Sequence, residues 1–184
     1  MTAGPDAGPG APRSRTVPDA VFGPVTITDH AADGLVVVPG PGLPGVDLRR
    51  IGPVTERLVP IGSRRPGHVE LRVDGHRHVL RPASGRLSRR SYHVHVELDG
   101  APLLLAADSP TTARWIRGRS RRDHVLGTLG REGDHLLPAR WCRDGTPGPT
   151  AAEAAVGYAV ATAFGTGARI MIAEVLAGVL GALS

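Results

Sequence analysis

The feature that most constrains this chain is the apolar stretch over residues 149–184. Between Ala154 and Ala168 it contains no charged residue. Thr150 and Glu153 stand at its start in the T-x-x-E spacing of a capping box, in which each side chain accepts a hydrogen bond from the other residue's backbone N–H. Glu153 also places a negative charge in the first turn, where the helix dipole favours it. We therefore predict a helix that begins at Ala151.

A helix that is apolar nearly all round lies either in a protein core or in a membrane. A spanning helix needs ~20 predominantly apolar residues, but Arg169 and Glu174 interrupt this stretch. A charge at mid-bilayer costs about 2.5–3.5 kcal/mol on insertion scales, and residues 165–167 (Gly-Thr-Gly) predict a break or kink. We favour a core helix over two alternatives, a membrane anchor and an exposed amphipathic or oligomerising helix.

The charge balance favours an anionic partner. All 22 basic residues are arginine, and the formal net charge is +5. Such a charge attracts phospholipid head groups, nucleic acid or acidic proteins, although GC-rich codons also account for an excess of Arg over Lys. Cys142 is the single cysteine, so no intramolecular disulfide is predicted. The first 15 residues carry no apolar signal segment. We expect a cytoplasmic protein that can also contact a membrane peripherally.

Residues 21–148 have the texture of a strand-rich domain. Residues 1–20 are mainly Gly, Ala, Pro, Ser and Asp and predict a disordered tail. After them, short runs of Val, Ile, Leu and Thr alternate with turn residues, and Asp-Gly at 74–75 and 99–100 indicates tight hairpins. Ser109, Pro110 and Gly118 flank a predicted short helix over 111–117. The predicted strands are 25–28, 35–38, 46–51, 54–61, 68–73, 76–81, 91–98, 101–107, 124–129 and 135–141.

Short strands followed by one long helix favour a barrel or sandwich over a βαβ fold. In the segment 91–98 the apolar residues Tyr92, Val94, Val96 and Leu98 alternate with polar ones, which indicates one core face and one wet face. The chain has few aromatic residues to fill a barrel, and a helix of small residues would fill it. We predict a mainly β fold, an antiparallel β-barrel of about 10–12 short strands over 21–148. The barrel encloses the hydrophobic C-terminal α-helix of residues 149–184, which completes the same domain.

This order of elements resembles the tubby C-terminal-domain fold, which is shared by tubby-like, LURP-one-related and phospholipid-scramblase-related proteins. The residues that carry the resemblance are Arg122-Asp123-His124-Val125-Leu126-Gly127, the strand end at Trp141 and the helix over 150–168. It extends over residues 21–184. The resemblance implies a barrel around a buried helix and contact with membranes, since tubby-like proteins hold phosphoinositide head groups with basic residues. It transfers no site residue, because no basic residue matches position by position.

Arginine doublets and their neighbours are the candidate anion-binding residues. A guanidinium group binds phosphate through two parallel hydrogen bonds, so a face that gathers several would hold head groups or a nucleic-acid backbone. Nucleic acid is the less favoured partner, since stacking aromatics are nearly missing and only Trp115 lies near the cluster. The alternative is an ordinary solvated face. The candidates are Arg89, Arg90, Arg114, Arg117, Arg119, Arg121 and Arg122.

Two His-x-His pairs support a different hypothesis. His76 and His78 lie on one predicted strand, and His93 and His95 lie on the next predicted strand. Alternate strand positions share a face, and neutral imidazoles at that spacing bind Zn²⁺ or another divalent metal. His93 and His95 share their face with Glu97 and are expected to face solvent, so surface histidines are the favoured interpretation.

The chain shows no G-x-S-x-G, Walker, C-x-x-C or H-E-x-x-H motif. We therefore expect a non-enzymatic binding module with no cofactor, which contacts an anionic phospholipid surface through Arg-bearing loops. The alternatives are a metal-dependent β-barrel enzyme that uses the four histidines and a protein anchored to a membrane by its C-terminal helix. The sequence leaves the oligomeric state open.

Overall fold

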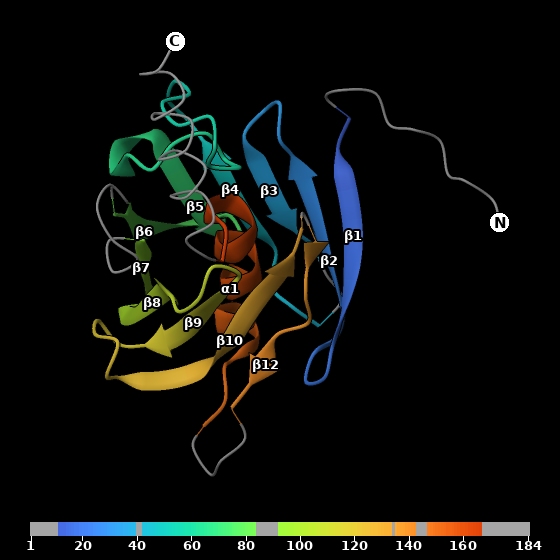
Figure 1. Ribbon diagram of the computed structural model, residues 1–184, viewed down its shortest axis with the longest axis vertical. Coiled ribbons are helices and arrows are strands. Elements are labelled where there is room, and N and C mark those ends of the chain that lie inside the picture. The colour runs from blue at the N-terminus through green and yellow to red at the C-terminus, as the bar shows by residue number, and fades with distance from the viewer. Residues whose placement is uncertain (1–10, 40–41, 84–91, 134, 143–146, 167–184) are drawn as a thin grey trace, which may run out of the picture.

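The computed structural model describes residues 11–39, 42–83, 92–133, 135–142 and 147–166. These residues form an antiparallel β-barrel around one α-helix, as Figure 1 shows. The strands are β1 (Arg13–Asp19), β2 (Gly23–His30), β3 (Leu35–Val38), β4 (Val46–Arg50), β5 (Val69–Val73), β6 (His76–Pro82), β7 (His93–Leu98), β8 (Ala101–Ala107), β9 (Thr112–Arg117), β10 (His124–Glu132), β11 (His135–Leu136) and β12 (Arg140–Trp141). A 3₁₀ turn, Pro66–His68, precedes β5, and the helix α1 spans Ala151–Phe164.

The strands pair in chain order from β1 to β11, each antiparallel to the next, and β12 pairs with β10. The Asp-Gly sequences form the two expected hairpin turns, in which Asp74 and Asp99 have φ of 48° and 49° and the glycines that follow have φ of 81°. Positive φ at both central residues is the condition for the tight turn that matches the twist of two paired strands. The predicted fold class, an antiparallel barrel around a C-terminal helix, is confirmed.

Helix α1 begins at Ala151 with the predicted capping box. The Thr150 side chain accepts from the Glu153 N–H at 3.2 Å, and the Glu153 carboxylate accepts from the Thr150 N–H at 2.7 Å. Every residue from Glu153 to Phe164 is buried, and the surrounding strands supply the rest of one hydrophobic core. The helix ends where Gly165 adopts φ of 79°, a conformation that favours glycine.

The core interpretation is therefore confirmed for residues 151–164, whereas residues 167–184 lie outside the described residues. Within the described parts of the chain, no helix has the length and apolar character needed to cross a bilayer.

The predicted helix over 111–117 is wrong, since Thr112–Arg117 form strand β9. The Ser109 hydroxyl accepts from the N–H groups of Thr111 and Thr112 at 3.1 and 3.0 Å, which makes a turn between β8 and β9. Ser and Pro favour such turns as readily as helix starts. The β-branched and aromatic residues that follow then favour a strand.

Three other boundaries differ from the prediction. Residues 54–61 form a loop between β4 and β5 and not a strand, because Pro53 and Pro60 each lack an N–H for a sheet ladder. The segment 135–141 is divided into β11 and β12 around Pro138 for the same reason. The disordered tail over 1–20 is wrong for Arg13–Asp19, which form β1, and residues 1–10 lie outside the described residues.

The barrel is nearly closed. Among the described residues, β1 pairs with β2 but forms no ladder with β10, β11 or β12, and this unpaired junction is called the seam below. Side-chain hydrogen bonds fasten β1 to β12 and to α1. Near one end of the barrel, Trp141 Nε1 and the Tyr158 hydroxyl donate to Asp19 at 2.7 and 2.5 Å. Near the other end, where α1 terminates, Arg15 donates to the Thr162 hydroxyl at 3.5 Å.

Candidate functional site

A polar pocket lies in the seam at the end of the barrel where α1 terminates. It has a volume of about 270 Å³. Its lining comes from β1, β2, the β4–β5 loop, β10 and β11, so four strands and a loop build it. We call it the seam pocket, and its lining residues are Arg13, Ser14, Arg15, Asp29, Pro60, Arg131 and His135.

The alternation of β1 places the first two arginines in the pocket. Val17 and Asp19 are buried on the inward face of this strand, and Arg13 and Arg15 share that face because side chains two apart point the same way. In the ladder with β2, Arg13 pairs with Asp29. The inward face of β1 thus changes from apolar in the middle of the barrel to basic at its mouth.

The opposite wall follows the same rule. Leu129 of β10 is buried and pairs with the buried Ala113, and Arg131 lies two residues further along the same strand face. Arg131 pairs with Leu136 of β11, which brings His135 to the rim of the pocket. Arginines from the first and the tenth strand therefore meet at the seam.

The pocket carries three guanidinium groups and one carboxylate. Burial raises the pKa of the Asp29 carboxyl above its ordinary value, although the charges of Arg15, Arg131 and Arg13 act in the opposite direction. The C-terminal end of α1 carries a partial negative charge, which favours nearby cations. An anionic ligand that entered the pocket beside Asp29 would meet an excess of positive charge. The site is partly desolvated, and charge-assisted hydrogen bonds are strong in such a setting.

Three of the five predicted arginines in the described part of the chain have acidic partners within the protein. Arg117 points to the barrel interior, where it makes two hydrogen bonds of 2.7 Å with the Glu153 carboxylate. The Arg114 Nε lies 3.0 Å from the Asp108 Oδ1, and a terminal guanidinium nitrogen of Arg119 lies 3.0 Å from the Glu97 Oε1. These intramolecular partners already occupy three of the predicted anion ligands.

The remaining predicted arginines are divided between a surface loop and an undescribed segment. Arg121 donates to the carbonyl of Ala107 at 2.8 Å, and Arg122 is exposed between β9 and β10. Arg89 and Arg90 lie outside the described residues.

The histidine pairs are also separated. His78 pairs with the buried Leu71 in the ladder and so belongs to the inward face of β6, whereas His95 pairs with Arg81 on the outward face. The four-histidine metal site is therefore not formed, because the two pairs lie on opposite faces of the sheet. Within the described residues, no group of three or more His, Cys, Asp and Glu side chains is arranged to hold a metal ion.

His93 and His95 lie beside each other on the outer wall. Their rings meet edge to face with centroids 5.0 Å apart. Burial lowers the pKa of His95, and the neighbouring His93, Arg119 and Arg81 lower it further. A second cavity of about 200 Å³ lies here, but its lining includes Glu97, which already pairs with Arg119.

Arg64 is a further residue that the sequence did not distinguish from the other arginines. It is 4% exposed, donates to the Ala83 carbonyl at 2.7 Å and stacks over the rings of Tyr92 and Phe164. Burial lowers the pKa of this guanidinium. The adjoining cavity of about 10 Å³ has room for a water molecule at most, so it offers no ligand site. The contact of Arg64 with Phe164 instead holds the loop between β4 and β5 against the end of α1.

Sequence reasoning missed every charged residue of the seam pocket. Arg13 and Arg15 fell in the supposed tail, and Asp29 and Arg131 belong to no doublet. The usable signal was the alternation Arg-x-Arg-x-Val-x-Asp over 13–19, which has the period of a strand but a mixed polar and apolar inward face.

Comparison with known proteins gives no relative: no protein-family model, no curated protein and no solved structure matches this chain. The function must therefore be argued from the site itself.

Proposed function

We propose that this barrel is a non-enzymatic binding module that holds a phosphate- or carboxylate-bearing ligand in the seam pocket. The observation that supports the proposal is the convergence of Arg13, Arg15 and Arg131 from two strands that are not paired with each other. Guanidinium groups match the geometry of these anions. The head group of an anionic phospholipid is the ligand source that agrees with the tubby-like resemblance.

The Asp29 carboxylate makes anion binding in the pocket depend on pH. The carboxylate lies among the three arginines and offsets part of their charge, so a bound anion competes with it. Protonation of Asp29, or its replacement by Asn, removes this competition. We therefore expect anion affinity to rise as the pH falls through the raised pKa of Asp29.

The test measures sulfate binding by isothermal titration calorimetry at constant ionic strength, because sulfate keeps its charge over the acidic range. We expect Arg131→Gln to weaken sulfate binding roughly tenfold, the effect of losing one charge-assisted hydrogen-bonding group. Arg140→Gln, an equal change of charge at an exposed position on β12, is the matched control and should bind like the wild type.

Asp29→Asn should bind sulfate several-fold more tightly at neutral pH and lose the acid-dependent gain of the wild type. Because His135 is present in both proteins, the comparison isolates the effect of Asp29. The proposal fails if Arg131→Gln and Arg140→Gln bind sulfate equally well.

A second arm identifies the source of the anion. Sedimentation with phosphatidylcholine vesicles that contain phosphatidylglycerol reports on a lipid head group, and titration with inorganic phosphate reports on a free anion. Binding of phosphate without any vesicle dependence would retain the pocket and reject the lipid source.

A further inference from the structure

Exposed apolar side chains concentrate in the β4–β5 loop, residues 51–65. Among the described residues, Ile51, Val54 and Leu58 are 49%, 51% and 45% exposed. The other large apolar residues with comparable exposure, Val21, Val79 and Leu137, lie on separate elements. Exposed apolar groups that gather at one place and are surrounded by polar residues mark an interaction surface.

The loop has a fixed structure of its own. The N–H groups of Thr55 and Glu56 donate to the Gly62 carbonyl at 2.8 and 3.1 Å, and the Ile61 N–H donates to the Ala163 carbonyl of α1 at 3.0 Å. Val59 and Ile61 are buried under the same loop. The loop therefore buries some of its apolar side chains, whereas those of Val54 and Leu58 point to solvent.

The charge around these side chains is positive. Glu56 is the only acidic residue in the loop, and its carboxylate accepts from the Arg64 N–H at 3.1 Å. Arg57 and Arg65, in the same loop as the apolar residues, are exposed. Long Arg side chains extend along an apolar surface while the charged group stays at the water interface.

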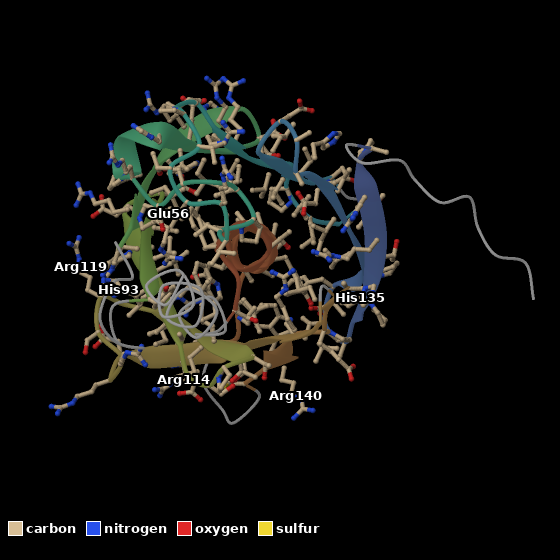
Figure 2. All side chains as sticks on the ribbon, turned by 45° about the horizontal axis from the view of Figure 1, so that its top comes forward. Glu56, His93, Arg114, Arg119, His135 and Arg140 are labelled. Atoms are coloured by element: carbon tan, nitrogen blue, oxygen red, sulfur yellow. The ribbon has the colours of Figure 1, made fainter. Side chains whose placement is uncertain are left out.

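The loop and the seam pocket lie at the same end of the barrel. Pro60, in the middle of the loop, lines the pocket, and the loop covers the C-terminal end of α1. This end is at the top of Figure 1, and Figure 2, turned to bring it forward, labels Glu56 in the loop and His135 at the pocket. An anionic surface that met this end would reach the apolar side chains and the pocket arginines together.

We propose that this end docks on an anionic phospholipid bilayer, with Ile51, Val54 and Leu58 inserted among the lipids and a lipid phosphate in the seam pocket. The proposal rests on the proposed function for the phosphate, but the insertion of the loop is a separate claim. A bilayer fits the surface because small apolar contacts add to electrostatic attraction at a membrane interface.

The first experiment measures sedimentation of the full chain with vesicles of phosphatidylcholine and phosphatidylglycerol. We expect Val54→Ser combined with Leu58→Ser to lower the partition coefficient about tenfold, because two apolar side chains no longer enter the lipid. Val79→Ser, at an exposed apolar position on the outer wall of β6, is the matched control and should partition like the wild type. Sulfate binding by the double variant should be unchanged, which separates loop insertion from the pocket.

The second experiment follows insertion directly. An environment-sensitive fluorophore is attached to Leu58→Cys in a Cys142→Ser background, and to Val79→Cys in the same background as the control. We expect a blue shift on anionic vesicles at position 58 and none at position 79. No shift at position 58 would overturn the docking face even if the pocket binds sulfate, and an equal shift at both positions would overturn it as well, since it would indicate adhesion without orientation.

Discussion

Asp19 accepts four hydrogen bonds, from the Val21 and Phe22 N–H groups, Trp141 Nε1 and the Tyr158 hydroxyl. It is 6% exposed, and its partners come from β1–β2, β12 and α1. Burial raises the pKa of Tyr158, and its hydrogen bond to Asp19 acts in the same direction, so the phenol remains a donor. One side chain thus joins the first strand, the last strand and the helix.

We expect Asp19→Ala to lower the free energy of unfolding by about 2–5 kcal/mol, because it leaves the buried donors of Trp141 and Tyr158 without an acceptor. Urea denaturation followed by tryptophan fluorescence measures the change. Asp33→Ala, an exposed aspartate between β2 and β3, is the control and should be close to neutral. Equal stability of the two variants would contradict the bridging role.

At the scale of elements, α1 is surrounded by the barrel, and side chains of β9 also bind it directly. Trp115 donates through Nε1 to the Glu153 carbonyl at 2.9 Å, and Arg117 pairs with the Glu153 carboxylate. Burial acts to raise the pKa of Glu153, but the hydrogen bonds from Arg117 and Thr150 and the charge of Arg117 outweigh it. The pKa of Glu153 therefore lies below its ordinary value.

A carboxyl group with a lowered pKa stabilises the fold above its unfolded pKa and loses that contribution as the pH falls through the folded value. We expect Glu153→Gln to lower the free energy of unfolding by about 2–4 kcal/mol at neutral pH. The difference should narrow in acid, below the ordinary pKa of 4.5. Thr150→Ala, which removes the cap but leaves the ion pair, should cost about 1 kcal/mol. A Glu153→Gln penalty that does not change with pH would rule out the ion pair as its source.

The elements also show what the sequence could predict. The capping box, the Asp-Gly turns and the Tyr92–Leu98 alternation each depend on neighbours in the chain, and each was predicted correctly. Strand β1 was missed because Arg13, Arg15 and Asp19 occupy its inward face, so its alternation is not hydrophobic. Thr112–Arg117 was missed because a serine turn and a helix cap use the same residues.

The seam pocket could not be predicted because its charged residues are far apart in the sequence. Arg15 and Arg131 come together only when the first and tenth strands meet, and this requires the radius of the barrel and the position of α1. Among the arginine doublets in the described part of the chain, only Arg49-Arg50 lies on a strand, and there successive side chains point to opposite faces of the sheet.

At the scale of the whole molecule, α1 is the part of the core around which the sheet curves. Its side chains from Glu153 to Phe164 are buried, and they contact strands on several sides of the barrel. We expect a chain that ends at Gly148 to lack a cooperative thermal transition, because the inward faces of the strands would lose the helix that fills them. Circular dichroism and dye binding measure this, with the full chain as the reference.

A full-length Val160→Asp variant tests the same claim without truncation, since it places an unpaired charge at a fully buried position. It should be strongly destabilised. A cooperatively folded fragment, or a Val160→Asp protein as stable as the wild type, would show that the strands do not need the helix.

The seam has a consequence for how this cylinder can be assembled. In a barrel whose two edge strands pair through backbone hydrogen bonds, the last ladder forms only when the barrel closes. Among the described residues no ladder joins β1 to β10, β11 or β12, so all the ladders described here can form while the sheet is still open. The sheet can then close around α1, and the hydrogen bonds that Asp19 accepts from Trp141 and Tyr158 fasten the first strand to β12 and to the helix. Loss of these two hydrogen bonds would open the barrel at the seam and leave the backbone ladders between the strands intact.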